Sequence, residues 1–178
     1  MPKAGTIAAL GPVIQQAYLP EDFDAALTYW TETMGVGPFF LLENIRLGEM
    51  KYMGEPSDAE FSVAIAYWDD IQIELVRPDN DASAHYTGKY KIHEGMHHTC
   101  QFVDDIEEVR KILLDAGATI VVEGNVGEDG RVIYADPGYG PGGICEFVQL
   151  GAGGPELFAM MKDAAKNWDG SDAVRKLG

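Results

Sequence analysis

Residues 98–114, HTCQFVDDIEEVRKILL, repeat in outline residues 15–30, QQAYLPEDFDAALTYW. Each stretch opens with a short apolar run that is typical of a strand. Each then passes through acidic residues into apolar positions with helical spacing. Two copies of one pattern in a single chain indicate an internal duplication, and this duplication organises the rest of the sequence.

Two aspartates fix the alignment of the copies. Asp22 lies seven residues after Gln15, and Asp105 lies seven residues after His98. A carboxylate at such a position caps the free amides that open a helix. Gln15 and His98 are therefore equivalent positions on the first strand of each half.

Both halves continue as extended chain after the helix. The expected strands cover residues 39–44, 61–68 and 71–76 in the first half, and residues 119–123, 131–135 and 143–150 in the second. In the last strand of each half, Ile73-Glu74-Leu75-Val76 matches Cys145-Glu146-Phe147-Val148. Glu74 and Glu146 thus become a second equivalent pair, and the sequence predicts an α+β protein built of two strand-helix-three-strand modules.

The length of 178 residues suits a single domain. We expect residues 1–178 to form one unit, in which the tail after Gly151 supplies an amphipathic C-terminal helix. Its parts are module one at residues 11–77, a linker or loop over the site at 78–94, module two at 95–150, and the C-terminal helix and tail at 151–178.

Composition limits the function. The net charge is −16, from 29 acidic and 13 basic residues, so the protein repels phosphate backbones and anionic membrane surfaces. We therefore expect no nucleic-acid or membrane partner, and the same field disfavours highly anionic substrates such as coenzyme A esters. The sequence shows neither a membrane-spanning apolar run nor a secretory signal, so a cytoplasmic location is expected.

The central prediction is one divalent metal ion bound by Gln15, Glu74, His98 and Glu146. A carboxylate in the middle of an apolar strand must be paired, protonated or bound to metal, because its burial alone costs several kcal/mol. Alternation along the strands turns single polar groups inward among apolar neighbours. One nitrogen and three oxygens leave positions open on such an ion.

The other histidines are expected outside the site. Strand alternation turns His97 to the face opposite His98, although a slip of one residue would reverse that assignment. His85 and His93 lie in the linker, where they are expected to face solvent.

The pattern resembles the vicinal oxygen chelate superfamily, which includes glyoxalase I, methylmalonyl-CoA epimerase, extradiol dioxygenases and bleomycin- and fosfomycin-resistance proteins. The resemblance covers about residues 12–150. Its carriers are residues 15–26, Gly35-Val36-Gly37-Pro38-Phe39, Ile73-Glu74-Leu75-Val76, Gly95-Met96-His97-His98, Val103-Asp104-Asp105-Ile106 and Ile144-Cys145-Glu146-Phe147. It implies two tandem βαβββ modules that form a cupped, incompletely closed mixed β-barrel around a metal.

Within that superfamily the set of Gln15, Glu74, His98 and Glu146 resembles the eukaryotic type of glyoxalase I, in which a ligand glutamate also moves the substrate proton. Extradiol dioxygenases use two histidines and one carboxylate on iron, so this set argues against oxygen chemistry. Epimerases usually carry histidine where Gln15 stands. The basic groups that hold glutathione in glyoxalase I have no match in this sequence.

The functional prediction is a metal-dependent isomerase or lyase that transfers a proton next to a carbonyl group of a bulky, mostly apolar small molecule. Glu146 is the first candidate for the base and Glu74 the second. Zinc or nickel is the expected ion, with cobalt, manganese or magnesium as alternatives. The residues expected in the substrate pocket are Tyr18, Phe39, Phe40, Tyr67, Trp68 and Cys100.

Two other functions stay open. The same cup can sequester an apolar small molecule without chemistry, as resistance proteins of the superfamily do. An open metal position can also activate water for hydrolysis or ring opening. A homodimer is a further expectation, since modules of this superfamily often complete their site across two subunits.

Overall fold

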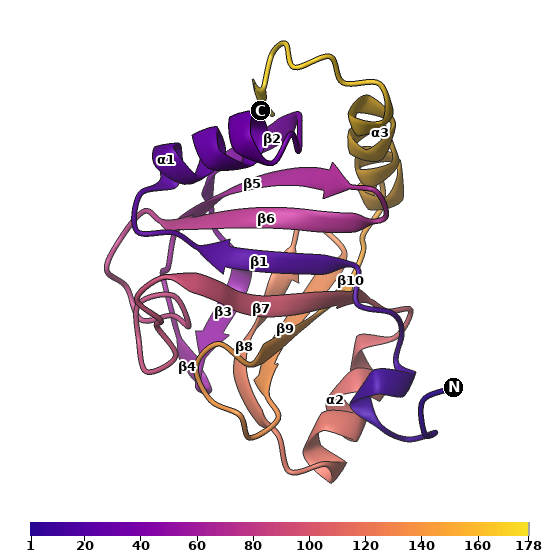
Figure 1. Cartoon of the computed structure of the whole chain (residues 1–178). Coiled ribbons are helices and arrows are strands. Elements are labelled where there is room, and N and C mark those ends of the chain that lie inside the picture. Colours follow the sequence, from indigo (N-terminus) through magenta and orange to yellow (C-terminus); the bar gives the residue numbers. More distant parts are fainter. Residues whose placement is uncertain (178) are drawn as a thin grey trace.

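The computed structural model describes residues 1–177, which form one curved mixed sheet of 11 strands with helices on its outside (Figure 1). A short 3-10 turn, η1 (Ile7–Ala9), precedes the first module. That module contains β1 (Gln15–Leu19), α1 (Phe23–Thr28), the π-helical turn η2 (Tyr29–Thr33), β2 (Phe39–Ile45), β3 (Gly48–Tyr52), β4 (Glu55–Pro56), β5 (Phe61–Trp68) and β6 (Ile71–Pro78). The second contains β7 (Gly95–Phe102), α2 (Ile106–Asp115), β8 (Thr119–Val126), β9 (Gly130–Asp136) and β10 (Ile144–Gln149), and the tail adds α3 (Gly154–Lys166) and β11 (Val174–Lys176).

The strand order confirms the predicted fold class. Along the sheet it is β11-β2-β5-β6-β1-β7-β10-β9-β8-β3-β4, so β11 and β4 form its two edges. The first strands of the two modules, β1 and β7, run side by side and antiparallel at its centre (Figure 1). The sheet curls into a cup that is incompletely closed, as expected.

Strand register shows the internal duplication residue by residue. In module one, β1 pairs with β6 so that Gln15 faces Gln72 and Ala17 faces Glu74. The parallel pair β7–β10 of module two has the same register, in which His98 faces Ile144 and Cys100 faces Glu146. Between the modules Gln15 faces Cys100 and Ala17 faces His98, as a local two-fold axis requires.

The two capping aspartates act as predicted. The carboxylate of Asp22 accepts a hydrogen bond from the Ala25 amide at 2.9 Å. Asp105 accepts from the amides of Glu107 and Glu108 at 2.9 and 3.2 Å. Each carboxylate satisfies amide groups that have no partner inside the helix, and so it fixes where the helix begins.

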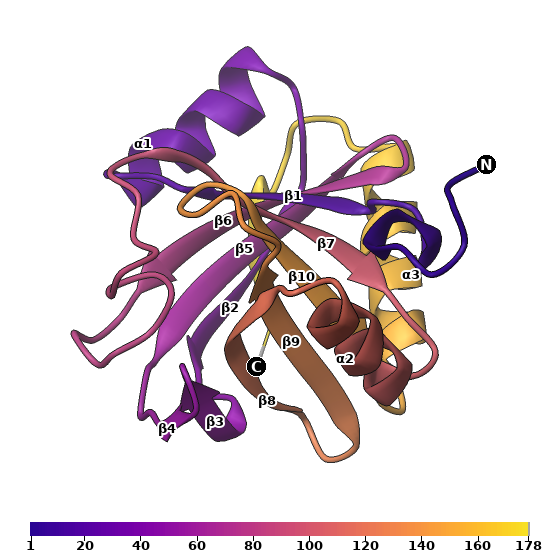
Figure 2. The same cartoon turned by 90° about the horizontal axis from the view of Figure 1, so that it is seen from below.

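Helices α1 and α2 cover the outside of the sheet, one on each module (Figure 2). Phe23 and Leu27 of α1 pack with Phe39 and Leu75 on the outer face of module one. Residues Ile106, Val109 and Leu113 of α2 pack on the outer face of module two with Ile133, Ala135 and Phe147. The opposite face of each strand is left to line the inside of the cup.

A hairpin from module one extends the sheet of module two. Strands β3 and β4 pair with each other, and Lys51 and Tyr52 of β3 pair with Glu123 and Val122 of β8. The sequence analysis did not predict this hairpin. It interlocks the two modules.

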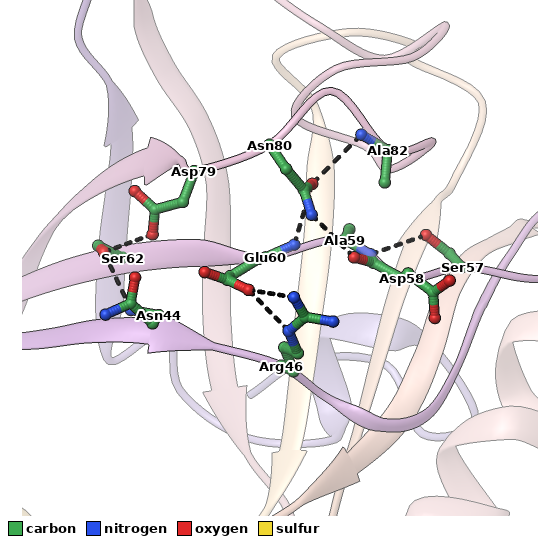
Figure 3. Close-up of polar contacts among 10 residues, drawn as sticks. All are labelled: Asn44, Arg46, Ser57, Asp58, Ala59, Glu60, Ser62, Asp79, Asn80 and Ala82. Carbon is green, nitrogen blue, oxygen red and sulfur yellow. Dashed lines mark hydrogen bonds and ion pairs between the residues drawn. The ribbon is translucent and has the colours of Figure 1, made fainter.

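The middle of the linker between the modules is packed into the interior of the protein. Its first residues are held against β2 and β5 by the polar contacts drawn in Figure 3, where the Asn80 side chain accepts from the amides of Glu60 and Ala82. His93 is exposed as expected. The expectation for His85 was wrong: its side chain is fully buried, because the linker folds inward behind β7 rather than over the surface.

Helix α3 closes one side of the cup, where it lies beside β5 (Figure 1). Met161 is fully buried, and the Phe158 ring lies 5.1 Å from the ring of Phe102. The C-terminal helix thus packs on the sheet of its own chain. Among residues 1–177, no helix is both long and apolar enough to span a membrane.

Candidate metal and proton-transfer site

The structure brings together all four predicted ligands from the two modules. Gln15, Glu74, His98 and Glu146 come from β1, β6, β7 and β10, the four central strands of the sheet. Each is at least 93% buried, with exposed fractions of 4, 7, 0 and 7%. His98 Nε2 lies 3.3 Å from Glu146 Oε2 and 3.6 Å from Glu74 Oε1. One chain supplies the whole set.

Hydrogen bonds orient the amide of Gln15. Its Nε2 donates to Gln72 Oε1 at 2.9 Å and to Glu74 Oε2 at 3.2 Å. Gln72 is fixed in turn, because its own Nε2 donates to the Tyr67 hydroxyl at 2.7 Å. Since both donors of Gln15 point at these acceptors, its Oε1 is turned away from them and is free to bind a cation.

A bulge in β7 places His97 beside His98. Ala17 pairs with His98 and Tyr18 pairs with Met96, so that His97 is an extra residue in the strand. The alternation that should have turned His97 to the opposite face is interrupted there. Its Nδ1 lies 3.1 Å from His98 Nδ1, and the expectation that it stands apart was therefore wrong. Burial and the charge of His98 lower the pKa of His97 to about 3, which leaves its ring neutral at physiological pH.

The two carboxyl groups differ in their ease of ionisation. Burial, and next the charge of Glu146, raise the pKa of Glu74 well above its ordinary value. Burial also acts to raise the pKa of Glu146, but the neighbouring His98 ring, when it is charged, outweighs burial and lowers that pKa. The Tyr134 hydroxyl and the Cys100 thiol lower it further. Two carboxyl groups this close favour a state with one neutral and one ionised member.

Two buried atoms of the set lack partners that a cation would supply. Within the described part of the chain, neither Gln15 Oε1 nor His98 Nε2 has a hydrogen-bond partner. Among residues 1–177, no three His, Cys, Asp or Glu side chains stand as a preassembled metal cluster. The separations of 3.3 and 3.6 Å from His98 to the carboxylates nevertheless fit the roughly 3.3–3.6 Å between ligands held tetrahedrally at about 2.0–2.2 Å from an ion. The residues fit a divalent metal.

An apolar cavity of about 550 Å³ leads to this set. Gln15, Glu74 and Glu146 lie on its wall, and no Lys or Arg of residues 1–177 lines it. Its apolar walls come from both modules and from α3, and include Val63, Ile65, Phe102, Val132, Val148, Leu157, Phe158 and Met161. Such a cavity suits an uncharged apolar molecule that brings one polar group to the ligands.

Of the six residues predicted for the pocket, the structure places only Cys100 on the cavity wall. Tyr18, Phe39 and Trp68 belong to the outer face, where Tyr18 and Trp68 lie 5.5 and 6.4 Å from the Trp30 ring. The other two face inward but do not reach the cavity: Phe40 is buried in the apolar core, and Tyr67 contacts Gln72. Strand alternation accounts for the three residues on the outer face, whereas Phe40 and Tyr67 are held away from the cavity by their packing in the core and against Gln72.

Sequence reasoning missed three residues that support the site. Gln72 orients Gln15, His97 contacts His98, and Tyr134 lines the cavity beside Glu146. Alternation along β6 carried a signal for Gln72, because it shares a face with Glu74. No sequence signal marked the bulge at His97.

The comparisons with known proteins agree with this architecture. The profile of the Glyoxalase/Bleomycin resistance protein/Dioxygenase superfamily matches residues 15–134. No curated protein sequence matches the chain significantly.

Solved structures share the fold at low sequence identity. A crystal structure of selenomethionine-labelled methylmalonyl-CoA epimerase is 26% identical with a TM-score of 0.52, over 78% of this chain and 94% of that one. A Streptomyces coelicolor methylmalonyl-CoA epimerase variant in complex with 2-nitronate-propionyl-CoA is 19% identical with a TM-score of 0.57, over 80 and 99%. A hypothetical protein from Bacillus halodurans C-125 is 17% identical with a TM-score of 0.56, over 79 and 94%.

Proposed function

This chain belongs to the Glyoxalase/Bleomycin resistance protein/Dioxygenase superfamily, and we propose that it is a metal-dependent isomerase or lyase that moves a proton next to a carbonyl group. The observation that carries the proposal is the meeting of Glu74, His98 and Glu146 beside the free Oε1 of Gln15, at the wall of an apolar cavity. Buried carboxylates with different ionisation behaviour are suited to proton transfer.

Gln15, Glu74, His98 and Glu146 would hold the ion, for which zinc or nickel is the first choice and cobalt, manganese or magnesium the alternatives. When bound, the ion supplies the Lewis acidity that polarises a substrate carbonyl and makes its α-proton acidic. The apolar walls orient the substrate and exclude water.

Glu146 is the proposed base. It is the more readily ionised of the two carboxyl groups, so one of its oxygens takes the α-proton. Glu146 can then return the proton to the substrate, while Glu74 stays a ligand of the ion. The alternative assignment exchanges these roles, with Glu74 as base.

The proposed substrate is a bulky, mostly apolar molecule without phosphates. Methylmalonyl-CoA is the ligand of one epimerase of the same fold. In this chain the acidic side chains on the cavity wall are Glu74, Glu128, Asp129 and Glu146, and a coenzyme A ester would have to approach them with its charges uncompensated. A homodimer stays a prediction, which light scattering after size-exclusion chromatography tests.

Elemental analysis tests the metal site. We expect close to one ion per chain in the wild type and none in the double variant Glu74→Gln, Glu146→Gln. The matched control is Glu108→Gln, Glu156→Gln, which removes two exposed carboxylates and should keep the ion. Circular dichroism of all three proteins checks their folding.

Exchange of substrate α-protons in D₂O, followed by NMR over a panel of neutral aromatic ketones and aldehydes, tests the reaction. Exchange that needs both the ion and Glu146 supports proton transfer. A wild type that holds no ion and cannot be reloaded overturns the proposal in favour of sequestration, which the apolar cavity also accommodates. Consumption of water without α-proton exchange would indicate hydrolysis or ring opening.

A further inference from the structure

We propose that His97 is a positioning residue that keeps the Nε2 lone pair of His98 directed at the two carboxylates. It acts through a hydrogen-bond relay from His98 to His97 to the backbone carbonyl of His85. The consequence for metal affinity rests on the proposed function, whereas the relay itself does not.

Two hydrogen-bond distances connect the three groups. His98 Nδ1 lies 3.1 Å from His97 Nδ1, and His97 Nε2 lies 3.3 Å from the carbonyl oxygen of His85. All three residues are fully buried, so water does not compete for these atoms. The bulge in β7 is what makes the first contact, because it turns His97 toward its neighbour.

Counting protons assigns the direction of the relay. A carbonyl oxygen only accepts, so the His97 nitrogen that faces it must carry the N–H. A neutral imidazole has one N–H, which leaves His97 Nδ1 as an acceptor. His98 must then donate from its own Nδ1, and a neutral His98 has its lone pair on Nε2, the atom that faces Glu74 and Glu146.

This arrangement would be repulsive without a cation. Among the described residues no group donates a hydrogen bond to this lone pair, so a buried acceptor stays unpaired until a cation binds. The relay therefore prevents His98 from turning its N–H toward the carboxylates as a neutral ring, and it preserves the nitrogen as a ligand. A partner of this kind usually accounts for about 10–100-fold in metal affinity.

The competing explanation is that His97 only fills space. Its ring lies 5.0 Å from the Tyr86 ring and 5.3 Å from the His85 ring, inside a buried aromatic cluster. His97→Phe keeps the ring and removes both hydrogen bonds. His97→Gln offers an amide oxygen to His98 and an amide N–H to the carbonyl. Tyr86→Phe disturbs the same cluster without touching the relay.

Calorimetric titration of the metal-free proteins with Zn²⁺ separates these explanations. We expect His97→Phe to bind about 10–100-fold more weakly than the wild type, and His97→Gln to recover most of the affinity. Tyr86→Phe should bind as the wild type does. Equal affinity of wild type and a folded His97→Phe protein would overturn the proposal.

NMR of the wild type with ¹⁵N-labelled histidine tests the relay even if a variant does not fold or no metal binds. Long-range ¹H–¹⁵N correlations report which ring nitrogen carries the proton. We expect His97 to be protonated on Nε2 alone and His98 to be protonated on Nδ1. A proton on His97 Nδ1 contradicts the relay. A correct pair of tautomers in a protein that binds no Zn²⁺ would keep the relay and reject the proposed function.

Discussion

The two halves of the site hold equivalent ligands in different ways. In module one, the strand neighbour Gln72 anchors Gln15, whereas its counterpart in module two is the apolar Ile144. In module two, the proposed anchor of His98 is the preceding residue, His97, and the residue that precedes Gln15 is the apolar Ile14. Each half therefore has one polar support, at the position where the other half is apolar.

The chemistry of the two ligands explains this exchange. An amide carries its donor and its acceptor at the tip of the side chain, so its anchor must reach the tip, and a facing residue on the adjacent strand does so. An imidazole that binds through Nε2 has its other nitrogen, Nδ1, close to the backbone. The anchor of His98 must therefore come from nearby in its own strand, which a bulge allows.

Removing the carboxyl group of either half should have the largest effect on the reaction. If Glu146 is the base, Glu146→Gln lowers the rate of α-proton exchange by about 10²–10⁴-fold, because no other group replaces the proton acceptor. Glu74→Gln removes a ligand instead, so it should lower the affinity for Zn²⁺. Exchange rates measured at saturating Zn²⁺ distinguish the two, and unchanged exchange in Glu146→Gln would transfer the role of base to Glu74.

The next largest effect is expected when module one is made to resemble module two. Gln72→Leu removes the anchor that Ile144 never provides, and it frees the amide of Gln15 to rotate. Zn²⁺ affinity should fall about 10-fold, at the lower end of what such supports contribute. Ile144→Val, the matched change in module two, should leave Zn²⁺ affinity unaltered. Equal affinity of Gln72→Leu and the wild type would show that Gln15 needs no anchor.

Stability of the metal-free protein should depend on pH with opposite signs in the two halves. The raised pKa of Glu74 means that its contribution to folding is present at low pH and is lost as pH rises through that pKa. The lowered pKa of Glu146 gives a contribution that is present above its ordinary value near 4.5 and is lost on acidification. In urea unfolding with a chelator, Glu74→Gln should gain stability relative to the wild type between pH 5 and 8. A relative loss over that range would contradict the assignment.

The smallest effect is expected at Tyr67, which contacts the anchor Gln72 rather than a ligand. Tyr67→Phe removes the acceptor 2.7 Å from Gln72 Nε2 and leaves a buried donor unpaired, which costs about 1 kcal/mol. Zn²⁺ affinity should fall only a few-fold. Trp68→Phe, on the next residue but on the outer face, should change neither affinity nor exchange rate. A large loss in Trp68→Phe would mean that the outer face contributes to the site.

Much of the fold followed from the sequence, because the duplication constrains local patterns twice. Asp22 and Asp105 marked both helix starts, and the register of Glu74 and Glu146 followed from the alignment. The hairpin of β3 and β4 could not be found in this way. Its strands are short and largely exposed, and they are stabilised by pairing with β8, which is remote in the sequence.

The sequence analysis was less accurate in predicting which face of the sheet each side chain occupies. Phe39 and Phe40 are consecutive in one strand, so they cannot both line the cavity, and Gln15 facing inward requires Tyr18 to face outward. The corrections for Tyr18, Phe39 and Trp68 were available from alternation alone. The position of His97 was not, because a bulge depends on how two strands settle against each other rather than on either sequence.

The pairing of β1 with β7 also determines when the site can assemble during synthesis of the chain. Its strands are far apart in the chain, and the site that they centre on includes Glu146, which lies beyond residues 15–134. A ribosome adding about 5–20 residues per second needs roughly 4–14 s to pass from Glu74 to Glu146. Until β7 has been made, β1 lacks its partner strand, and until β10 has been made, Glu74 lacks Glu146. The nascent chain thus carries an incomplete site until the second module has been made.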